Sequence, residues 1–458
     1  MNKSVGAIVL AAGKGTRMYS DQPKVLRSIL GEPMLGYVLD GLVESFGDRV
    51  HVVVGFGAQS VMKAYPAFDG RFVLQEQQLG TGHALQCSWE AVKSAGYEHV
   101  LVVNGDVPLA AGKDLEIFVE QALSDSADLA FLTIQLGDAG SYGRIVRDAS
   151  GLACIVEAKD YDVSSHGPVT GEINAGIYLL RVSAIDSVLF NLTNANRSGE
   201  FYITDLAELV GQNGGRVVAV NRGRDENLLG INNPRELVAA EESLRARIVD
   251  KLLESGVVVR QPGSVRVGPN VTVSPGAEIC GPCDLLGVSS IGPRAVVEPH
   301  CWIKDSEVGA GAVIHAFSHL EKASVGPDCH AGPYARLRPG AVMMEGSRVG
   351  NFVEMKKSVL GPGAKASHLT YLGDAEIGAG ANVGAGTITC NYDGTQKHKT
   401  TIGAGAFIGS NTALVAPVTV GEGALVAAGS VVTEDVPDHA LAIARGRQVI
   451  KTRRKNPA

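Results

Sequence analysis

The sequence has no long hydrophobic run. Although 45% of its 458 residues are hydrophobic, no segment reaches the roughly 18 consecutive apolar residues that indicate a membrane-spanning helix. The apolar stretch from Val5 to Ala12 is too short for the core of a signal peptide and runs directly into Gly13-Lys14-Gly15, so we interpret it as a buried strand. We therefore expect a cytoplasmic protein without integral membrane contact.

Cysteines are few, and basic residues are not in excess. The seven cysteines are scattered and odd in number, which favours a reducing compartment over a disulfide framework. Cys280 and Cys283 have a spacing seen in metal sites, but no second suitable pair follows, so zinc remains a minor alternative. A net charge of −7 and a pI near 5.9 argue against general binding to nucleic acid. The basic run Lys451-Thr452-Arg453-Arg454-Lys455 is the exception.

Glycine is abundant, and the second half has a period of six. The 57 glycines concentrate after residue 260, where they predict many tight corners. Apolar residues recur at every sixth position from Val267 to Ile303, the phase slips by one at Val308, and the repeat resumes in several stretches up to Val426. A period of six fits neither a helix nor a single strand. It predicts a solenoid of short strands joined by turns.

The first half alternates short apolar runs with longer amphipathic segments, which predicts an α/β domain with a mainly parallel sheet. In such a sheet, ligands bind at the carboxyl ends of the strands. We predict a helix from about Asn233 to Glu254, with Pro234 near its start and Gly256 as a stop. The expected division is a domain at 1–232, a linker helix at 233–256 and a second domain at 257–458, whose repeats run to about Asp435. The expected strands are Ala7–Leu10, Val50–Val54, Val100–Val103, Leu129–Ile134 and Ile177–Leu180.

A glycine-containing loop follows the first strand. In Leu10-Ala11-Ala12-Gly13-Lys14-Gly15-Thr16-Arg17-Met18, followed by Pro23-Lys24, backbone N–H groups can approach phosphate oxygens and the cations can neutralise them. The run matches neither the Walker form nor the dinucleotide-binding form. On its glycines alone, an ordinary strand-to-helix turn is about as good an explanation. The complete run through Lys24 resembles the sugar-1-phosphate nucleotidyltransferase family.

Further segments resemble that family in the same order along the chain: Leu74 to His83, Asn104-Gly105-Asp106, Tyr142-Gly143-Arg144, Val156 to Lys159, Glu172 to Gly176 and Gly230 to Asn233. Taken alone, Asp106 is more simply explained as a solvated loop carboxylate and Asn174 as a turn former. The occurrence of all these segments in the family's order favours a substrate-binding site instead. The resemblance implies that Arg17 and Lys24 are catalytic and that Asp106 and Asn232 hold one Mg²⁺. It implies binding of UTP and the sugar phosphate by Leu10, Ala11, Ala12, Gly13, Lys24, Gln75, Gly80, Thr81, Asn104, Gly105, Asp106, Gly143, Glu157, Asn174 and Asn232. Asn104 stands where better-known members carry an aromatic residue.

Polar segments interrupt the solenoid. They are Arg336 to Gly340, Val349 to Lys357, Ser367 to Asp374 and Asn391-Tyr392-Asp393-Gly394, the last within a gap in the repeat between Val383 and Ile402. Insertions in solenoids usually project to one face and serve binding. A lone histidine is more often structural than catalytic, but arginine, lysine, tyrosine and asparagine surround His368 in neighbouring coils.

Together the two halves resemble the family of bacterial bifunctional N-acetylglucosamine-1-phosphate uridylyltransferase/glucosamine-1-phosphate N-acetyltransferases. The resemblance covers essentially the whole chain. It implies a Rossmann-like α/β nucleotidyltransferase domain, a linker helix and a left-handed parallel β-helix of hexapeptide repeats that forms a homotrimer. The handedness departs from the usual right-handed crossover and comes from the resemblance, because the period does not determine it.

The resemblance also implies roles in the second domain. His368 is the general base for the amine of glucosamine-1-phosphate, and Glu354 orients or supports its imidazole. Tyr371, Asn391 and the backbone at Ser410 steady the amine or the developing oxyanion. The implied contacts to glucosamine-1-phosphate are Arg338, Lys356, Tyr371, Asn382 and Lys397. The implied contacts to acetyl-CoA are Ala385, Asn391, Tyr392, Ser410, Ala428 and Arg445, with Asn382 also near this site; the basic tail either meets its phosphates or is solvated.

Two alternatives remain open from the sequence. One is a single-activity sugar-1-phosphate nucleotidyltransferase whose β-helix only oligomerises or regulates, as in ADP-glucose-type pyrophosphorylases. The other is a non-catalytic assembly subunit built on the same two folds, as in some translation-factor complexes. The intact Lys24, Asp106 and Asn232 argue against the second, and His368 with the Asn391 loop argues against the first.

Overall fold

The computed structural model describes residues 4–147, 151 and 153–452. The chain divides into two compact units, Met1–Glu242 and Ser243–Ala458, and the division falls within helix α8 (Pro234–Glu254). In the described part of the chain, no helix is both long enough and apolar enough to cross a membrane.

The first unit is built on a nine-stranded sheet whose main path has the order β11-β7-β10-β6-β1-β4-β5. Strand β1 pairs in parallel with β4 and β6, whereas β10 is antiparallel to both β6 and β7. The sheet is thus mainly parallel, as predicted, with β10 and β9 as its reversed strands. Its strands are β1 (Val5–Ala11), β4 (Val50–Val54), β5 (Phe72–Leu74), β6 (His99–Asn104), β7 (Leu129–Gln135), β8 (Arg144–Arg147), β9 (Ala153–Val156), β10 (Glu172–Arg181) and β11 (Val217–Asn221).

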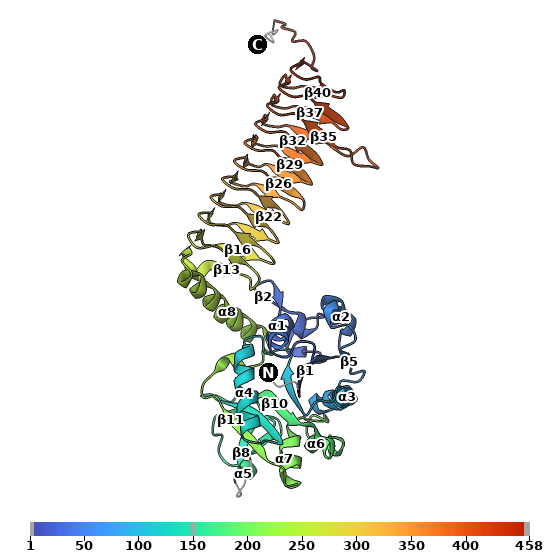
Figure 1. Ribbon diagram of the computed structural model, residues 1–458, viewed down its shortest axis with the longest axis vertical. Coiled ribbons are helices and arrows are strands. Elements are labelled where there is room, and N and C mark those ends of the chain that lie inside the picture. The colour runs from blue at the N-terminus through green and yellow to red at the C-terminus, as the bar shows by residue number, and fades with distance from the viewer. Residues whose placement is uncertain (1–3, 148–150, 152, 453–458) are drawn as a thin grey trace, which may run out of the picture. The chain divides into compact units, whose positions relative to one another are not determined.

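Apolar residues alternate between the two faces of this sheet. Along β1, Val5, Ala7 and Val9 belong to one buried cluster, and Ile8 and Leu10 belong to another. Both faces are covered (Figure 1), which is why the strand reads as a continuous apolar run rather than an alternating one. The four strands that the sequence analysis did not predict, β5, β8, β9 and β11, are short, and most of their residues are only partly buried.

Helices and short strands complete the first unit. They are β2 (Ser28–Ile29), β3 (Glu32–Pro33), α1 (Met34–Phe46), α2 (Ala58–Ala64), α3 (Thr81–Ser94), α4 (Gly112–Ser124), α5 (Val163–His166), α6 (Val182–Asp186) and α7 (Asp205–Gln212). The loop after β1 carries a 3₁₀ turn at Thr16–Met18, and a second such turn spans Lys24–Leu26.

Helix α8 begins at Pro234, one residue after the expected start. The Asn233 side-chain oxygen accepts a hydrogen bond from the Glu236 backbone N–H at 3.0 Å, which caps the first turn. Near the other end, Ile248 and Leu252 pack against the core of the second unit.

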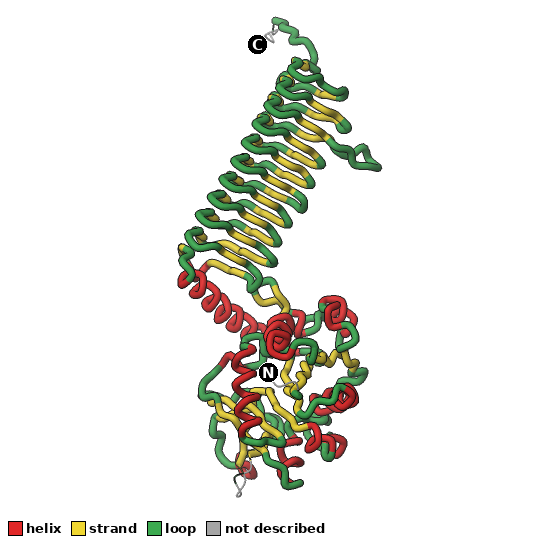
Figure 2. The backbone as a smooth tube through the Cα atoms, viewed as in Figure 1, coloured by secondary structure: helices red, strands yellow, loops and turns green. Residues whose placement is uncertain are grey.

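The second unit is a stack of coils with three parallel sheets (Figure 2). The first sheet contains β12 (Val258–Arg260), β15 (Glu278–Cys280), β18 (Val296–Val297), β21 (Val313–Ile314), β24 (His330–Ala331), β27 (Arg348–Asn351), β30 (Lys365–His368), β33 (Asn382–Val383), β36 (Phe407–Ile408), β39 (Leu425–Val426) and β41 (Leu441–Ala442). The second sheet contains β13 (Val265–Val267), β16 (Cys283–Leu286), β19 (Trp302–Lys304), β22 (His319–Glu321), β25 (Arg336–Leu337), β28 (Glu354–Lys356), β31 (Tyr371–Gly373), β34 (Ile388–Cys390), β37 (Ala413–Val415) and β40 (Val431–Val432). The third sheet contains β14 (Thr272–Val273), β17 (Ser290–Ile291), β20 (Glu307–Val308), β23 (Ser324–Val325), β26 (Ala341–Met343), β29 (Ser358–Leu360), β32 (Ala375–Ile377), β35 (Thr400–Ile402) and β38 (Val418–Val420).

The coil length explains the slip in the sequence repeat. Ile279 pairs with Val297, and Val297 pairs with Ile314, so a coil of 18 residues is followed by one of 17. These three side chains are fully buried inside the stack, because each sixth residue points inward from one of the three sheets. The shorter coil moves the phase by one without exposing the apolar side chains.

The repeat continues further than predicted. Strand β41 pairs in parallel with β39, so the stack extends past Asp435, where the sequence analysis ended it. In this last strand Leu441 is exposed and Ala442 is only partly buried. The strand therefore lacks the buried apolar residue by which the six-residue repeat is recognised in the sequence. Of the basic run at the end, Arg453 to Lys455 lie outside the described residues. The fold class is α/β followed by parallel β, consistent with the left-handed β-helix that the resemblance implies.

Candidate active sites

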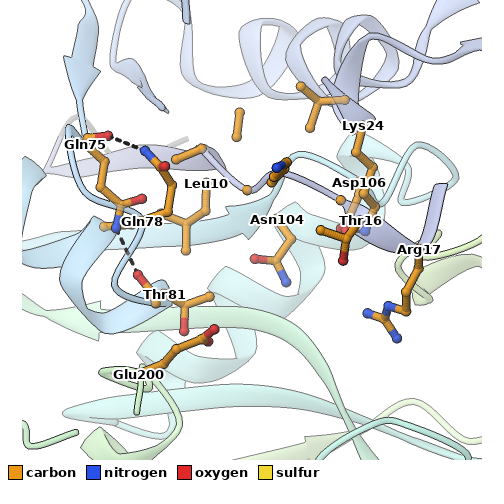
Figure 3. Close-up of a pocket in the computed structure, with 18 residues that line it drawn as sticks. Leu10, Thr16, Arg17, Lys24, Gln75, Gln78, Thr81, Asn104, Asp106 and Glu200 are labelled. Carbon is orange, nitrogen blue, oxygen red and sulfur yellow. Dashed lines mark hydrogen bonds and ion pairs between the residues drawn. The ribbon is translucent and has the colours of Figure 1, made fainter. Parts of the chain in front are cut away.

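A cavity of 470 Å³ lies at the carboxyl ends of β1 and β6 in the first unit (Figure 3). In the view of Figure 3, Lys24, Asp106 and Arg17 lie toward one end of it and Gln75 and Thr81 toward the other. Asn104 is seen between the two groups. The predicted residues that line this cavity are Leu10, Ala11, Ala12, Gly13, Arg17, Lys24, Gln75, Gly80, Thr81, Asn104 and Asp106.

A second cavity of 160 Å³ shares Arg17, Thr81, Asn104 and Asp106 with the first. It is also lined by the remaining predicted residues Gly143, Glu157, Asn174 and Asn232. Of the residues predicted to bind UTP or the sugar phosphate, Gly105 lines neither cavity. Its backbone N–H donates to the Leu10 carbonyl at 2.9 Å. The structure therefore gathers residues from seven separate segments around two cavities that share part of their lining.

Gln75 is held in place at the wall of the larger cavity. Its side chain is buried, and its amide nitrogen donates to the Gly80 carbonyl at 3.1 Å. Gly80 has a positive φ of 112°, and a Cβ there would lie 2.5 Å from the Phe201 carbonyl oxygen. Only glycine fits this position, because both the backbone conformation and the close approach exclude a side chain.

The charged centre of the site consists of Lys24, Asp106, Asn232 and Arg17. The Lys24 ammonium forms an ion pair with Asp106 and donates to the Asn232 side-chain oxygen at 3.0 Å. Arg17 donates to the same Asn232 oxygen at 2.9 Å. The structure thus brings together all four residues to which the resemblance assigned catalysis or metal binding.

The donors at this centre fit a divalent cation. The second carboxylate oxygen of Asp106, Oδ1, is buried and has no hydrogen-bond partner among the described residues. A buried carboxylate oxygen without a partner is costly unless a cation or water satisfies it. Carboxylate and amide oxygens are ligands that Mg²⁺ accepts, with water and substrate phosphates completing its shell. Within the described chain no group of three histidine, cysteine or acidic side chains could hold a metal ion.

Sequence reasoning missed Tyr142 as a pocket residue. Its hydroxyl donates to the Gly230 carbonyl at 3.1 Å, and burial raises the pKa of Tyr142 to about 12. It therefore remains a neutral donor that joins the Gly143 segment to the Gly230–Asn233 segment. In the sequence, the one indication that Tyr142 belongs to the site was its position next to Gly143.

Two acidic groups interact beside the smaller cavity: Glu157 lines it, and Asp205 lies close enough to Glu157 to be repelled by it. Burial raises the pKa of Glu157, whose carboxylate accepts from the Thr204 hydroxyl at 3.2 Å. Burial, followed by repulsion from Glu157, raises the pKa of Asp205 to about 6. Ionising the partly buried Asp205 beside Glu157 therefore costs stability at neutral pH.

The Asp205→Asn variant is expected to be more stable than the native protein at pH 7.5. The folded state raises the Asp205 pKa from 3.8 to about 6, so its contribution to stability is fully present below the unfolded pKa and is lost as pH rises through about 6. Asparagine never ionises, so the free energy of unfolding of the first unit should rise by about 1 kcal/mol at pH 7.5, after allowance for solvent screening and the helix N-terminus.

Urea unfolding followed at pH 4 and pH 7.5 measures this difference. At pH 4 the variant and the native protein should agree, because the native carboxyl is mostly protonated there. The exposed Asp48→Asn variant is the control and should show no such gain. Equal stability of native and Asp205→Asn proteins at both pH values would contradict the prediction.

In the second unit, three predicted cationic side chains lie around Glu354 and Tyr371. Arg338 donates to the Glu354 carboxylate at 2.8 Å, and Glu354 and Tyr371 are neighbours in register on β28 and β31. The close Lys397 ammonium lowers the pKa of Lys356, because two positive charges repel each other. An anion would relieve this repulsion, so the cluster is suited to a phosphate.

The predicted loop after β34 projects from the coils (Figure 2). A single bridge pairs Tyr392 with Lys397 across it, and Asp393 accepts hydrogen bonds that close its turn. At its base, Asn391 is buried and its amide donates to the Asp374 carboxylate. These contacts hold the loop, and with it the backbone of Lys397, in one conformation.

His368 is exposed and lies at the end of β30, on the other side of a corner from Tyr371. Its Nδ1 is 2.8 Å from the side-chain oxygen of Asn351, a residue that sequence reasoning did not select. Glu354, which was expected to support the imidazole, has its carboxylate bound by Arg338 and lies 3.8 Å from Arg336. Within one chain, the imidazole is thus held by Asn351.

The predicted acetyl-CoA residues Ala385, Ser410 and Ala428 repeat the position of His368 in later coils. In chain order, His368, Ala385, Ser410 and Ala428 each directly precede a residue with positive φ. These residues are Leu369, Gly386, Asn411 and Gly429. The four preceding residues therefore form one column along the corner between the first and second sheets. Arg445 closes the column, donating to the Ala428 carbonyl at 2.7 Å. Asn382 lies on the first sheet, beside Lys365 in register.

Comparison with known proteins gives matches in both units. Residues 7–160 match the MobA-like NTP transferase domain family, and residues 399–434 match the bacterial transferase hexapeptide family. The chain is 59% identical over 448 residues, 98% of both chains, to the bifunctional protein GlmU of Nitratidesulfovibrio vulgaris strain DP4. It is 58% identical over 456 residues, 100% of both chains, to GlmU of the Miyazaki F strain.

The chain belongs to the GlmU family.

The similarity extends to a more distant GlmU of Lawsonia intracellularis, which is 43% identical over 98% of both chains. The GlmU relatives span both units, including the charged centre around Asp106 and the column that begins at His368. The resemblance on which the sequence analysis relied is therefore confirmed at the level of the family.

Proposed function

We propose that this GlmU-family protein makes UDP-N-acetylglucosamine in two steps. The second unit transfers an acetyl group from acetyl-CoA to the amine of glucosamine-1-phosphate. The first unit then transfers a uridylyl group from UTP to N-acetylglucosamine-1-phosphate and releases pyrophosphate. The observation that carries this proposal is the near-complete match to proteins named bifunctional, together with a distinct polar site in each unit. We assign the two activities to residues 1–232 and 257–458, joined by the helix at 233–256.

In uridylyl transfer, the sugar phosphate attacks the α-phosphorus of UTP directly, and pyrophosphate leaves without a covalent enzyme intermediate. The protein's task is to position both substrates and to neutralise their charge. Lys24 and Arg17 supply positive charge at the centre of the site. Gln75 and the Gly80-Thr81 backbone form the wall suited to a uracil base, and Gly143, Glu157 and Asn174 form the wall suited to the sugar.

Asp106 and Asn232 are the residues that would hold Mg²⁺, because Asp106 Oδ1 is buried without a partner beside the Asn232 amide. When bound, Mg²⁺ supplies charge neutralisation for the phosphate oxygens. Lys24 contacts both of these side chains. Lys24 pairs with the other Asp106 oxygen, Oδ2, so its ammonium would lie beside a cation held at Oδ1 and could pair with a substrate phosphate.

The Gly230→Ala variant tests whether Asp106 holds the metal, because it adds a methyl group next to the Asp106 carboxylate without changing any proposed ligand. A Cβ at Gly230 would lie 3.1 Å from Asp106 Oδ1, which is the oxygen left without a partner. The added methyl group is expected to crowd a cation at that oxygen and to lower both Mn²⁺ affinity and uridylyl transfer by roughly tenfold. Mn²⁺ binding is measured by electron paramagnetic resonance, and pyrophosphate release by a coupled assay.

The matched control is Gly137→Ala, because a Cβ at Gly137 would meet no atom within 4 Å. This control should bind Mn²⁺ and release pyrophosphate as the native protein does. Native Mn²⁺ affinity in the Gly230 variant would contradict a metal at Asp106 Oδ1.

In acetyl transfer, a base removes a proton from the sugar amine as it attacks the thioester. We assign this base to His368, since an imidazole is suited to proton transfer near neutral pH. Arg338, Lys356 and Lys397 form the phosphate-binding cluster, with Tyr371 and Asn382 completing the sugar site. The column of Ala385, Ser410 and Ala428, with Arg445, offers acetyl-CoA a continuous path along the corner, and we assign Asn391 and Tyr392, on the loop after β34, to the same substrate.

We further propose that the protein is a homotrimer through the β-helix. In support, the predicted acetyltransferase residues of one chain fall on two faces on either side of a corner, with His368 on β30 and Tyr371 on β31. A closed symmetric oligomer can bring one face of each chain against the other face of its neighbour. Analytical ultracentrifugation gives the mass directly, and a monomeric active enzyme would overturn this proposal.

Two assays on one preparation test the bifunctional proposal. Thiol release from acetyl-CoA should require glucosamine-1-phosphate, and pyrophosphate release from UTP should require N-acetylglucosamine-1-phosphate. Pyrophosphate release without sugar-dependent thiol release would instead support a single-activity nucleotidyltransferase with a structural β-helix.

A further inference from the structure

The contact between Asn351 and His368 joins neighbouring coils at equivalent positions. The two residues are register partners on the parallel strands β27 and β30. Each directly precedes a corner residue in the left-handed region, Phe352 with φ 56° and Leu369 with φ 48°. Because the two backbones follow the same path one coil apart, their side chains leave the stack side by side.

The backbone around the imidazole is fixed on both sides. The Leu369 N–H donates to the Asn351 carbonyl at 3.0 Å. The buried Thr370 hydroxyl donates to the His368 carbonyl at 2.7 Å. With the main chain held in this way, the 2.8 Å contact between Asn351 Oδ1 and His368 Nδ1 sets the orientation of the ring.

An amide oxygen accepts a hydrogen bond but cannot donate one, so the nitrogen facing it must carry the ring proton. We propose that Asn351 is the positioning residue of the acetyltransferase site, holding His368 in the tautomer with hydrogen on Nδ1. This tautomer leaves a lone pair on Nε2 as the base. The inference rests on the proposed acetyl transfer, and it adds the group that makes His368 competent for it.

The proton balance of the step follows from this tautomer. As the amine nitrogen bonds to the thioester carbon, Nε2 takes one amine proton and the ring becomes an imidazolium. When the carbon–sulfur bond breaks, the imidazolium returns that proton to the leaving thiolate, giving free coenzyme A. Throughout both steps Nδ1–H keeps donating to Asn351, so the ring does not turn between them.

The choice of an amide rather than a carboxylate has a physical consequence. A carboxylate at this distance would favour the imidazolium and hold the ring in its charged form. The charged and titratable groups around the ring are His315, His330 and Arg348, which line the same cavity, and Lys365 on its own strand. Across the corner, the Glu354 carboxylate is already paired with Arg338. An uncharged partner therefore orients the ring without adding a negative charge that would favour the imidazolium.

Two substitutions separate orientation from charge. Asn351→Ala removes the acceptor and is expected to lower kcat for acetyl transfer by roughly tenfold or more, with the KM for acetyl-CoA nearly unchanged. Asn351→Asp keeps the acceptor and adds charge, so its acidic limb in the pH profile of kcat should move up by about 1 pH unit. At high pH the Asp variant should regain most of the native rate, which a merely structural role would not produce.

The control is Asn270→Ala, an exposed asparagine on an earlier coil, which should keep the native profile. Uridylyl transfer and sedimentation of each variant report on folding and assembly in the same preparation. Nitrogen-15 NMR of labelled histidine, with the His368→Ala variant for assignment, should show His368 protonated at Nδ1 in the native protein.

The outcomes are distinguishable. Native kcat and pH profiles in both Asn351 variants, or a proton found on Nε2 of His368, would overturn the role of Asn351 and leave the proposed acetyl transfer standing. Full acetyl transfer by His368→Ala would instead overturn His368 as the base. A shifted acidic limb in Asn351→Asp with a slow Asn351→Ala supports the proposal.

Discussion

Replacing His368 by alanine is expected to lower acetyl transfer by roughly 10² to 10⁴-fold, the usual contribution of a general base, while uridylyl transfer stays at the native rate. His368 belongs to the second unit, and the cavities around Asp106 belong to the first. The variant should also keep its fold, because the His368 side chain is exposed and fills no part of the core. Thiol release and pyrophosphate release from the same preparation measure the two activities.

The exposed His439 provides a matched histidine on the same β-helix, and His439→Ala should retain both activities. If His368→Ala released thiol at the native rate, another group would have to be the base. If it lost both activities, the two sites would not be independent, and the assignment of one reaction to each unit would fail.

Replacing Asp106 by asparagine is expected to have the opposite pattern: uridylyl transfer falls by roughly 100- to 1000-fold and acetyl transfer is retained. Asparagine has nearly the same shape, but it removes the negative charge that pairs with Lys24 and replaces one of the two carboxylate oxygens by an amide nitrogen, which cannot bind a cation. Both a divalent cation and the Lys24 ammonium lose their main attraction at this point. Mn²⁺ affinity should therefore fall together with the rate.

The control is Asp48→Asn, whose carboxylate is fully exposed in the same unit and should change neither activity. Native Mn²⁺ affinity in Asp106→Asn would remove Asp106 from the metal site even if the rate fell. Loss of acetyl transfer in this variant would contradict the independence of the two units.

Several features were predictable from the sequence because their signals are local. The six-residue period predicted the coils, since each inward-facing side chain must be apolar at every turn of the solenoid. The strand β4 was predicted with the bounds that the structure has, Val50–Val54, because a strand covered on both faces is apolar throughout. Short, partly exposed strands such as β8 and β41 lack that signal, and they were missed.

The residues of the first site were named from a resemblance, and the structure adds how they meet. Lys24, Asp106 and Asn232 are far apart in the chain, yet one ammonium contacts both partners. No local pattern predicts a contact of this kind, because it depends on loops at the ends of different strands converging at one edge of the sheet. The same holds for Tyr142, which reaches the Gly230 carbonyl from another segment.

By itself the sequence determined the solenoid, the α/β half, the connecting helix and the residue types of two polar sites, since periodicity, glycine content and motif order are local properties. The tertiary structure alone decided which of those residues touch. It paired His368 with Asn351 rather than with Glu354, because stacking of coils places residues one coil apart in direct register. Coils of 17 and 18 residues both keep their strands in register, so the pairing depends on where each corner takes up the difference, and no local pattern in the sequence shows that.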